Sequence, residues 1–167
     1  MAVVSGPNSD PRQGVQNFRT PPDFLRACER KFGVTIGFDL ACSGPIDCVA
    51  PQGFAYPETD ALAVAWPETG PTDCAFCNPP YAKASSFARV ASESPHCRTL
   101  MLVPASVGTA WFAEYVHGRA LVCFLRPRLT FLQPDGTPMP QGINRDLMLL
   151  GYGWAPGVYV CEDWRQW

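Results

Sequence analysis

The sequence predicts an α/β fold built on a doubly wound, mostly parallel sheet with an antiparallel edge. Between residues 72 and 126, segments typical of buried strands alternate with segments typical of helices. Such alternation favours a parallel sheet with helices on both faces. The chain has 167 residues, of which 47% are hydrophobic and 17% charged. That length and composition predict one compact domain with a sizeable core.

The folded domain is predicted to span residues 18–167. Residues 1–17 are rich in Gly, Pro, Ser, Asn and Gln and show no periodicity, which predicts a flexible N-terminal arm. Thr20 as N-cap and Pro21 as first helical residue predict a helix that ends at Gly33. The elements predicted after it are strands over 34–40 and 72–77, a helix over 83–92, a strand over 98–104, a helix over 109–116, a strand over 120–126 and a final strand pair in "DLMLLGYG" and "VYVCE".

The segment from residue 42 to 73 is long and rich in turn residues, and a short helix is predicted around 61–65. A loop of this length inside a small domain usually has a function. The chain leaves no room for a separate target-recognition domain beyond this loop and residues 127–146. If the protein acts on a polymer, it is therefore expected to recognise a short target.

Charge and cysteine content narrow the class of protein. The net charge of −2 and the pI of about 5.6 give no global signal for a polyanionic partner. The eight cysteines follow no recognisable secretory signal, which predicts reduced thiols and a cytoplasmic location. Cys74 and Cys77 are spaced as in zinc sites, but they lie in a predicted strand and would point to opposite faces, so no metal is expected. No apolar run of eighteen residues predicts a membrane span.

Asp39 and Asn78 each follow or end a predicted strand, so they are expected at the same edge of the sheet, beside the crevice where such folds bind ligands. The Asn78 side chain offers one acceptor and two donors, and the two prolines after it leave rigid carbonyl acceptors. This set suits a planar amine, and Tyr81 adds a flat face for stacking. The alternative is an ordinary turn, because Asn and Pro are common loop residues.

The motif Asn78-Pro79-Pro80-Tyr81 after a buried strand resembles the catalytic motif of amino-methyltransferases that use S-adenosylmethionine. Upstream, "RTPPDF" resembles the Thr-Pro motif of such enzymes and "FDLACSG" resembles their acidic cofactor loop. Over residues 18–150 the layout is similar to that of the small phage-type DNA N6-adenine methyltransferases. The matching elements are Thr20-Pro21, Phe32-Gly33, Asp39-Leu40-Ala41, Asp60-Ala61-Leu62 with Trp66, Asn78 to Tyr81, and the downstream segments "LVPASVGTAWFAEYV" and "RPRLTF".

The resemblance implies a Rossmann-like methyltransferase fold, S-adenosylmethionine as cofactor and DNA as partner, in a monomer or homodimer. It implies an adenine flipped into a pocket, where Asn78 and the Pro79 carbonyl accept the amine hydrogens, Pro80 stiffens the turn and Tyr81 stacks on the base. It also implies a phage or prophage enzyme acting in the cytoplasm of a bacterial host. The implied cofactor-binding residues are Thr20, Pro21, Asp39, Ala41 and Asp60, and the implied DNA-binding residues are Lys83, Arg126 and Arg128.

Simpler roles stay open for several of these residues. Helix capping alone explains Thr20 and Pro21, capping of the following turn explains Asp39, and capping of the short helix around 61–65 explains Asp60. A solvated surface explains the arginines near residue 127. At the level of function, the alternatives are a methyltransferase acting on cytosine N4, an RNA base or protein glutamine, or a non-catalytic nucleic-acid-binding protein with a degenerate methyltransferase fold.

Overall fold

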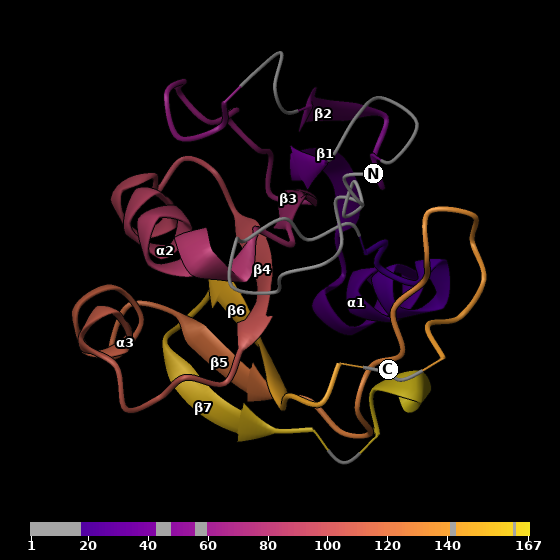
Figure 1. The fold of residues 1–167 in the computed structure, drawn as a ribbon. Helices are drawn as coiled ribbons and strands as arrows, with labels where there is room; N and C mark the ends of the chain where they lie inside the picture. Colours follow the sequence, from indigo (N-terminus) through magenta and orange to yellow (C-terminus); the bar gives the residue numbers. More distant parts are fainter. Residues whose placement is uncertain (1–17, 43–47, 56–59, 141–142, 162) are drawn as a thin grey trace, which may run out of the picture.

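The computed structural model describes residues 18–42, 48–55, 60–140, 143–161 and 163–167. The predicted N-terminal arm lies outside these residues. The strands of the described residues form a single seven-stranded sheet, which is flanked by helices on both faces (Figure 1). The strands are β1 (Thr35–Cys42), β2 (Gln52–Ala55), β3 (Asp73–Cys77), β4 (Thr99–Pro104), β5 (Leu121–Phe124), β6 (Leu147–Tyr152) and β7 (Gly157–Val160). The helices are α1 (Pro22–Phe32), α2 (Ala84–Glu93) and α3 (Ala110–Tyr115), with short 3-10 turns η2 (Tyr81–Lys83) and η3 (Trp164–Gln166).

The sheet has the order β2-β1-β3-β4-β6-β5-β7, and β6 alone among these strands runs against its neighbours. The predicted α/β class and mostly parallel sheet are therefore confirmed. The final two strands also form, but β5 lies between β6 and β7, so the prediction that they pair with each other is wrong. The antiparallel pairing on this side of the sheet comes from β6 with β4 and β5.

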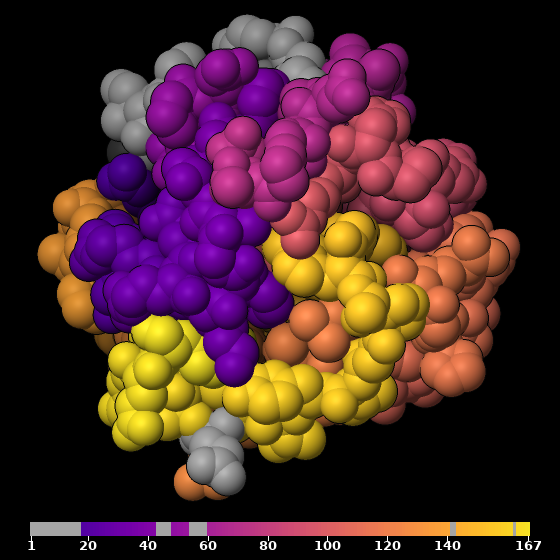
Figure 2. Space-filling model, turned by 180° about the vertical axis from the view of Figure 1, so that it is seen from behind, coloured from indigo at the N-terminus to yellow at the C-terminus, as the bar shows by residue number. Residues whose placement is uncertain are grey.

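Two hydrophobic cores sandwich the sheet. Met101 and Val103 of β4 face a core shared with α2 and α3, while Leu100 and Leu102 face a core shared with α1 and η3. Every residue of β4 is buried, as expected for a central strand covered on both faces. Burying one such side chain contributes about 1.5–3 kcal/mol, so this strand anchors the fold. On the α1 side, the first helix and the C-terminal residues lie side by side at the surface (Figure 2).

Helix α1 begins one residue later than the capping prediction requires. Pro21 occupies the N-cap position, Pro22 is the first helical residue, and no side chain caps the helix. The prediction that Thr20 is the N-cap is therefore wrong, and its hydroxyl bonds elsewhere, as described below. The end of the helix is as predicted, because Gly33 adopts φ 62°, a left-handed conformation that glycine reaches without a steric cost.

The long segment after β1 differs from the prediction in two ways. Strand β2 lies within it and extends the sheet beside β1. The helix expected around 61–65 is a turn, closed by a hydrogen bond from the Ala63 N–H to the Asp60 carbonyl at 2.9 Å. Short, isolated helices gain too few hydrogen bonds to offset the ordering of their first turn, which explains the outcome.

The cysteines do not all remain thiols. Cys42 and Cys48 form a disulfide, so the expectation that every cysteine is reduced is wrong for this pair. The other six cysteines are free and buried, including Cys74 and Cys77 in β3. Among the described residues, no helix combines the length and the apolar character needed to cross a bilayer.

Candidate active site

The predicted site residues meet at the carboxyl edge of the sheet. β1 and β3 pair in parallel with Asp39 opposite Phe76, so the chain leaves both strands at the same edge. Asn78 follows β3 directly, and Thr20, which immediately precedes the N-cap of α1, contacts it there. Three segments that are remote in sequence are thus brought to the place where parallel sheets bind ligands.

One polar atom of the Asn78 side chain is hydrogen-bonded, and the other has no partner in the described chain. Its Nδ2 donates to the Thr20 hydroxyl at 3.3 Å. Its Oδ1 is buried and has no hydrogen-bond partner within the described part of the chain. A buried acceptor without a partner costs about 1–3 kcal/mol, so it points to a group that binds there.

The two prolines continue from Asn78 into a tight turn. Pro79 is buried, and the carbonyl of Pro80 accepts the Lys83 N–H at 2.7 Å to close η2. The Tyr81 side chain is half-buried and packs against the core on the α1 side of the sheet. Because prolines fix φ, this turn holds Asn78 and Tyr81 in a defined relation to the strand.

Asp39 organises the loop that follows β1. Its Oδ1 accepts the Ala41 N–H and its Oδ2 accepts the Val49 N–H, each at 3.0 Å. Burial raises the pKa of this carboxyl, and the hydrogen bonds from Val49 and Ala41 act in the opposite direction. The simpler role considered for Asp39, capping the turn that follows, is therefore borne out, and cofactor binding by Asp39 stays a prediction.

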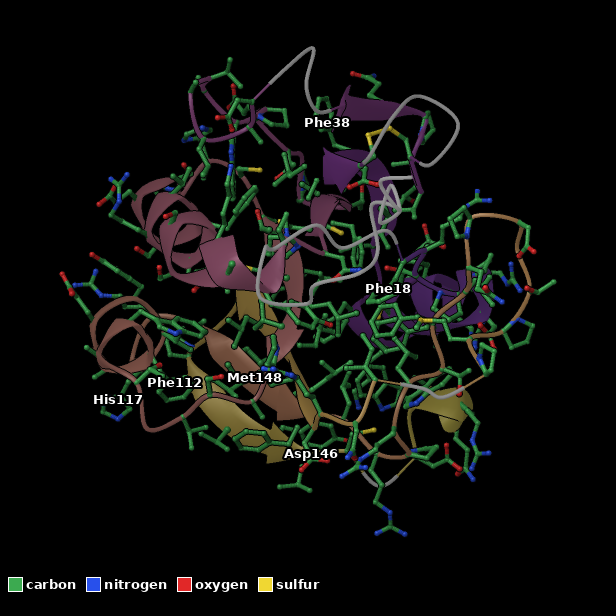
Figure 3. The ribbon with its side chains drawn as sticks, in the orientation of Figure 1. Phe18, Phe38, Phe112, His117, Asp146 and Met148 are labelled. Atoms are coloured by element: carbon green, nitrogen blue, oxygen red, sulfur yellow. A yellow bond between two sulfur atoms is a disulfide. The ribbon has the colours of Figure 1, made fainter. Side chains whose placement is uncertain are left out.

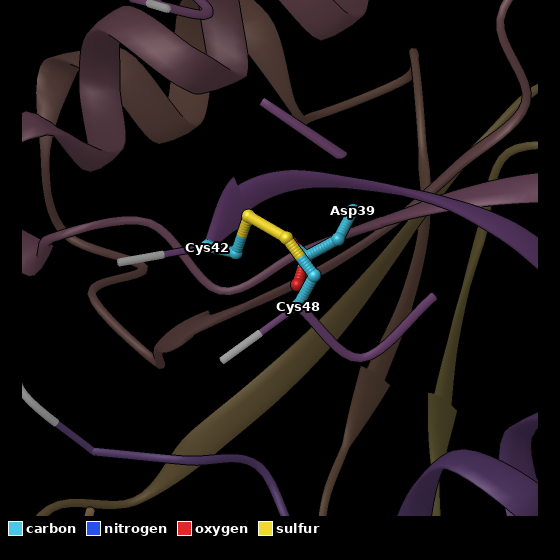
Figure 4. Close-up of side chains that lie close together, drawn as sticks. All are labelled: Asp39, Cys42 and Cys48. Atoms are coloured by element: carbon cyan, nitrogen blue, oxygen red, sulfur yellow. A yellow bond between two sulfur atoms is a disulfide. The ribbon is translucent and has the colours of Figure 1, made fainter. Parts of the chain in front are cut away.

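A disulfide closes the same loop beside this carboxylate. Figure 4 shows Cys42 and Cys48 joined next to Asp39. The possible ligand atoms of the three residues lie within 4.8 Å of one another. However, both sulfurs are consumed in the disulfide, and a metal needs them as thiolates. The cluster in this form is a structural clamp.

Asp60, the remaining acidic candidate, lies in an exposed turn. Its Oδ1 accepts the Leu62 N–H at 3.0 Å, so it caps a turn, whereas the short helix that it was expected to cap does not form. Just beyond the turn, the buried Trp66 indole donates to the Ala61 carbonyl at 2.8 Å and packs near Phe87 of α2. The large indole thereby fixes the turn that carries Asp60 to the body of the domain.

The three predicted DNA-binding side chains are exposed. Lys83 ends η2, and Arg126 and Arg128 follow β5, which runs parallel to β4 and so ends at the carboxyl edge of the sheet. The Arg128 guanidinium donates to Asp146 at 2.9 Å and to Asn144 at 3.0 Å. Asp146 lies just before β6 at this edge (Figure 3).

One part of the site was not foreseen from the sequence. Arg19 and Leu132 exchange two backbone hydrogen bonds of 2.9 Å, which ties the segment before α1 to residues 129–139. Phe18, labelled in Figure 3, packs against Phe131 with ring centroids 6.2 Å apart. The only local signal was the apolar character of these side chains, because the two segments lie more than a hundred residues apart.

An α/β sheet that presents an Asn-Pro-Pro-Tyr turn at its carboxyl edge is the arrangement that the resemblance to amino-methyltransferases implies. Residues 9–152 match the family model described as DNA N-6-adenine-methyltransferase (Dam), and the chain belongs to that family. It is therefore an enzyme that methylates the N6 amine of adenine in DNA. This finding favours adenine over cytosine N4, RNA bases and protein glutamine, and catalysis over a binding role. No curated protein matches the chain significantly.

Proposed function

We propose that this enzyme transfers the methyl group of S-adenosylmethionine to an adenine flipped out of the DNA helix, and that Asn78 accepts a hydrogen of the adenine amine. The observation that supports this proposal is the buried Oδ1 of Asn78, which lacks a partner in the described chain. An amine N–H is the donor this atom needs, and it is present only when substrate is bound.

The chemistry requires a change in the shape of the amine. The N6 lone pair is delocalised into the purine ring, which makes the amine a poor nucleophile. If Asn78 Oδ1 and the Pro79 carbonyl accept its two hydrogens, the nitrogen moves toward a tetrahedral geometry and its lone pair becomes available for the methyl carbon. The contribution of the protein is then orientation and fixed dipoles. As the nitrogen bonds to the methyl carbon, the C–S bond of the sulfonium would break with its electron pair staying on sulfur, and the methylated nitrogen would then release one proton to solvent.

The residues proposed for the cofactor fit a donor with amino, carboxyl and ribose groups. S-adenosylmethionine supplies an electrophilic methyl on a sulfonium. Each carboxylate oxygen can accept more than one hydrogen bond, so Asp39 and Asp60 can bind cofactor groups while still capping their turns. We place Thr20, Pro21 and Ala41 around the same molecule, because they adjoin Asn78 and Asp39 at the carboxyl edge.

Base and backbone contacts complete the proposal. Tyr81 stacks on the flipped adenine with the exposed part of its ring, while Pro80 holds the turn rigid. Lys83, Arg126 and Arg128 contact DNA phosphates, since they are exposed cations at the same edge as Asn78. The acidic overall charge makes such a local set necessary for DNA affinity.

The test is mass spectrometry of nucleosides from DNA of a host that lacks adenine methylation. Wild type should produce N6-methyladenine, and Asn78→Ala should reduce it to background. Ser92→Ala, which alters a remote hydroxyl on α2, should match wild type. Full modification by Asn78→Ala would refute the role of Asn78, and N4-methylcytosine in place of N6-methyladenine would refute the adenine pocket. Calorimetric titration with S-adenosylmethionine tests the cofactor, and absence of binding at millimolar ligand would refute it.

A further inference from the structure

The segment that carries Thr20 is fixed on both sides. Arg19 pairs with Leu132 through two backbone hydrogen bonds, and the Pro21 carbonyl accepts the N–H groups of Phe24 and Leu25 at the start of α1. Thr20 itself is only 4% exposed. Its hydroxyl therefore has little freedom to move, and it does not cap the helix.

The hydroxyl of Thr20 contacts the nitrogen of the Asn78 amide and not its oxygen. It accepts a hydrogen bond from Nδ2 at 3.3 Å, and no other hydrogen-bond partner of this amide is found among the described residues. A planar amide held by its nitrogen directs its oxygen away from the holder. The arrangement thus accounts for an Oδ1 that is buried but still without a partner.

The orientation of the amide decides whether it can act on an amine. With Nδ2 on Thr20, Oδ1 is free to accept. If the amide turned by half a revolution about its last bond, Nδ2 would meet the amine hydrogens, and two donors would face each other. The last torsion of an amide side chain is broad, so rotamer energy does not select one orientation of Asn78. The Thr20 hydroxyl can accept from Nδ2 or donate to Oδ1, so it fixes the place of the amide, and the hydrogens of a bound amine select the orientation that turns Oδ1 toward them.

We propose that Thr20 is a positioning residue for methyl transfer, which anchors the Asn78 amide at the place where Oδ1 can reach the adenine amine. This inference rests on the proposed function of Asn78 and deepens it. It assigns to Thr20 a role in turnover, where the resemblance of the Thr-Pro motif implies a contact with the cofactor. The link from Leu132 through Arg19 to Thr20 makes residues 129–139 part of the support for the catalytic motif.

The discriminating variant is Thr20→Val, which keeps the shape of the side chain and removes the hydroxyl. It should lower the single-turnover rate of methyl transfer about ten- to hundredfold, as for other small losses of alignment. Because Val keeps the shape that Thr20 presents to the cofactor, the dissociation constant of S-adenosylmethionine should stay within about twofold of wild type. Thr20→Ser should recover most of the rate, because it restores the hydroxyl.

Thr99→Val is the matched control. Thr99 is equally buried, its hydroxyl donates to the Cys97 carbonyl, and it lies at the start of β4, at the opposite edge of the sheet. This variant should lose stability without losing rate. A rate loss as large as that of Thr20→Val would indicate a general structural effect and overturn the inference.

A double variant tests whether Thr20 acts through Asn78. If it does, Thr20→Val should cost less of the remaining rate in an Asn78→Ala background than in wild type. An equal cost in both backgrounds would contradict the positioning role.

Nuclear magnetic resonance gives a readout that needs no turnover. In 15N-labelled protein, the side-chain NH2 signals of Asn78, assigned through Asn78→Ala, should move toward free-amide positions in Thr20→Val and not in Thr99→Val. Unmoved signals would refute the hydrogen bond.

Different results would refute the positioning role of Thr20 and the proposed role of Asn78. If Asn78→Ala is inactive but Thr20→Val is as fast as wild type, or if Thr20→Val loses rate in proportion to cofactor affinity, only the role of Thr20 falls. If Asn78→Ala is fully active, the proposed role of Asn78 falls and the positioning role falls with it.

Discussion

The loops after β1 and β3 leave the same edge of the sheet but differ in whether their buried side-chain oxygens are hydrogen-bonded. In the first, both carboxylate oxygens of Asp39 accept backbone N–H groups and a disulfide clamps the chain. In the second, the Asn78 oxygen is buried without a partner in the described chain. The polar groups of Asp39 are paired within the first loop, whereas the second loop leaves a buried acceptor that a ligand can pair. We infer that one loop maintains shape and the other performs chemistry.

The largest expected effect is on the rate, in the second loop. Asn78→Ala should reduce single-turnover methyl transfer about a hundred- to thousandfold, the loss typical of removing one preorganised polar group that acts on the transition state. The measurement is rapid quench with labelled S-adenosylmethionine at saturating DNA. Ser92→Ala serves as control. A rate loss below threefold in Asn78→Ala would contradict the inference that the second loop performs chemistry.

The next effect is on stability, in the first loop. Replacing both Cys42 and Cys48 with Ala should lower the free energy of unfolding by about 2.5 kcal/mol, the chain-entropy contribution of a short cross-linked loop. Reductant should destabilise wild type by a similar amount and leave the double variant unchanged.

Thiol counting checks the same bond independently. Since the remaining six cysteines are free and buried, Ellman's reagent should find six thiols after unfolding without reductant and eight after reduction. Eight thiols in both conditions would mean that the first loop has no disulfide.

The interactions of Asp39 should give a somewhat smaller effect. Asp39→Asn loses one acceptor and turns an NH2 group toward a backbone N–H, which should cost about 2 kcal/mol at neutral pH. Burial raises the folded-state pKa of Asp39 above the ordinary 3.8. The free energy of unfolding of wild type, relative to that of Asp39→Asn, should therefore be highest below pH 3.8 and should fall as pH rises through the folded pKa. Urea unfolding of both proteins across pH measures the difference. An advantage that grows with pH would contradict this sign.

The smallest effect is expected at the exposed arginines. The Arg128 side chain is 58% exposed and that of its partner Asp146 is 74% exposed, so Arg128→Ala should change the free energy of unfolding by less than about 0.5 kcal/mol. The slope of the logarithm of the DNA-binding constant against the logarithm of salt concentration should become shallower by about the amount of one phosphate contact. Arg89→Ala, whose ion pair with Glu93 lies on α2, should leave that slope unchanged. An unchanged slope for Arg128→Ala would exclude it from the interface.

Sequence patterns predicted the parts of the molecule that depend on nearby residues. The alternation from β3 to β5 was visible because apolar periodicity is local, and the motif at 78–81 was visible because it is contiguous. The order of strands was less accessible: β5 lies between β6 and β7 through pairings that no local pattern encodes. In the same way, Thr20 looked like a helix cap because its partner, Asn78, is 58 residues away.

The contrast between the two loops is tested most directly by the free energies of unfolding of Asn78→Ala and Asp39→Asn, measured side by side at neutral pH. Asn78→Ala should stay within about 1 kcal/mol of wild type, because losing the hydrogen bond to Thr20 is offset by removing a buried acceptor that has no partner in the described chain, while Asp39→Asn should lose about 2 kcal/mol. The reverse order, with Asn78→Ala the less stable variant, would contradict the account and make Asn78 a structural residue.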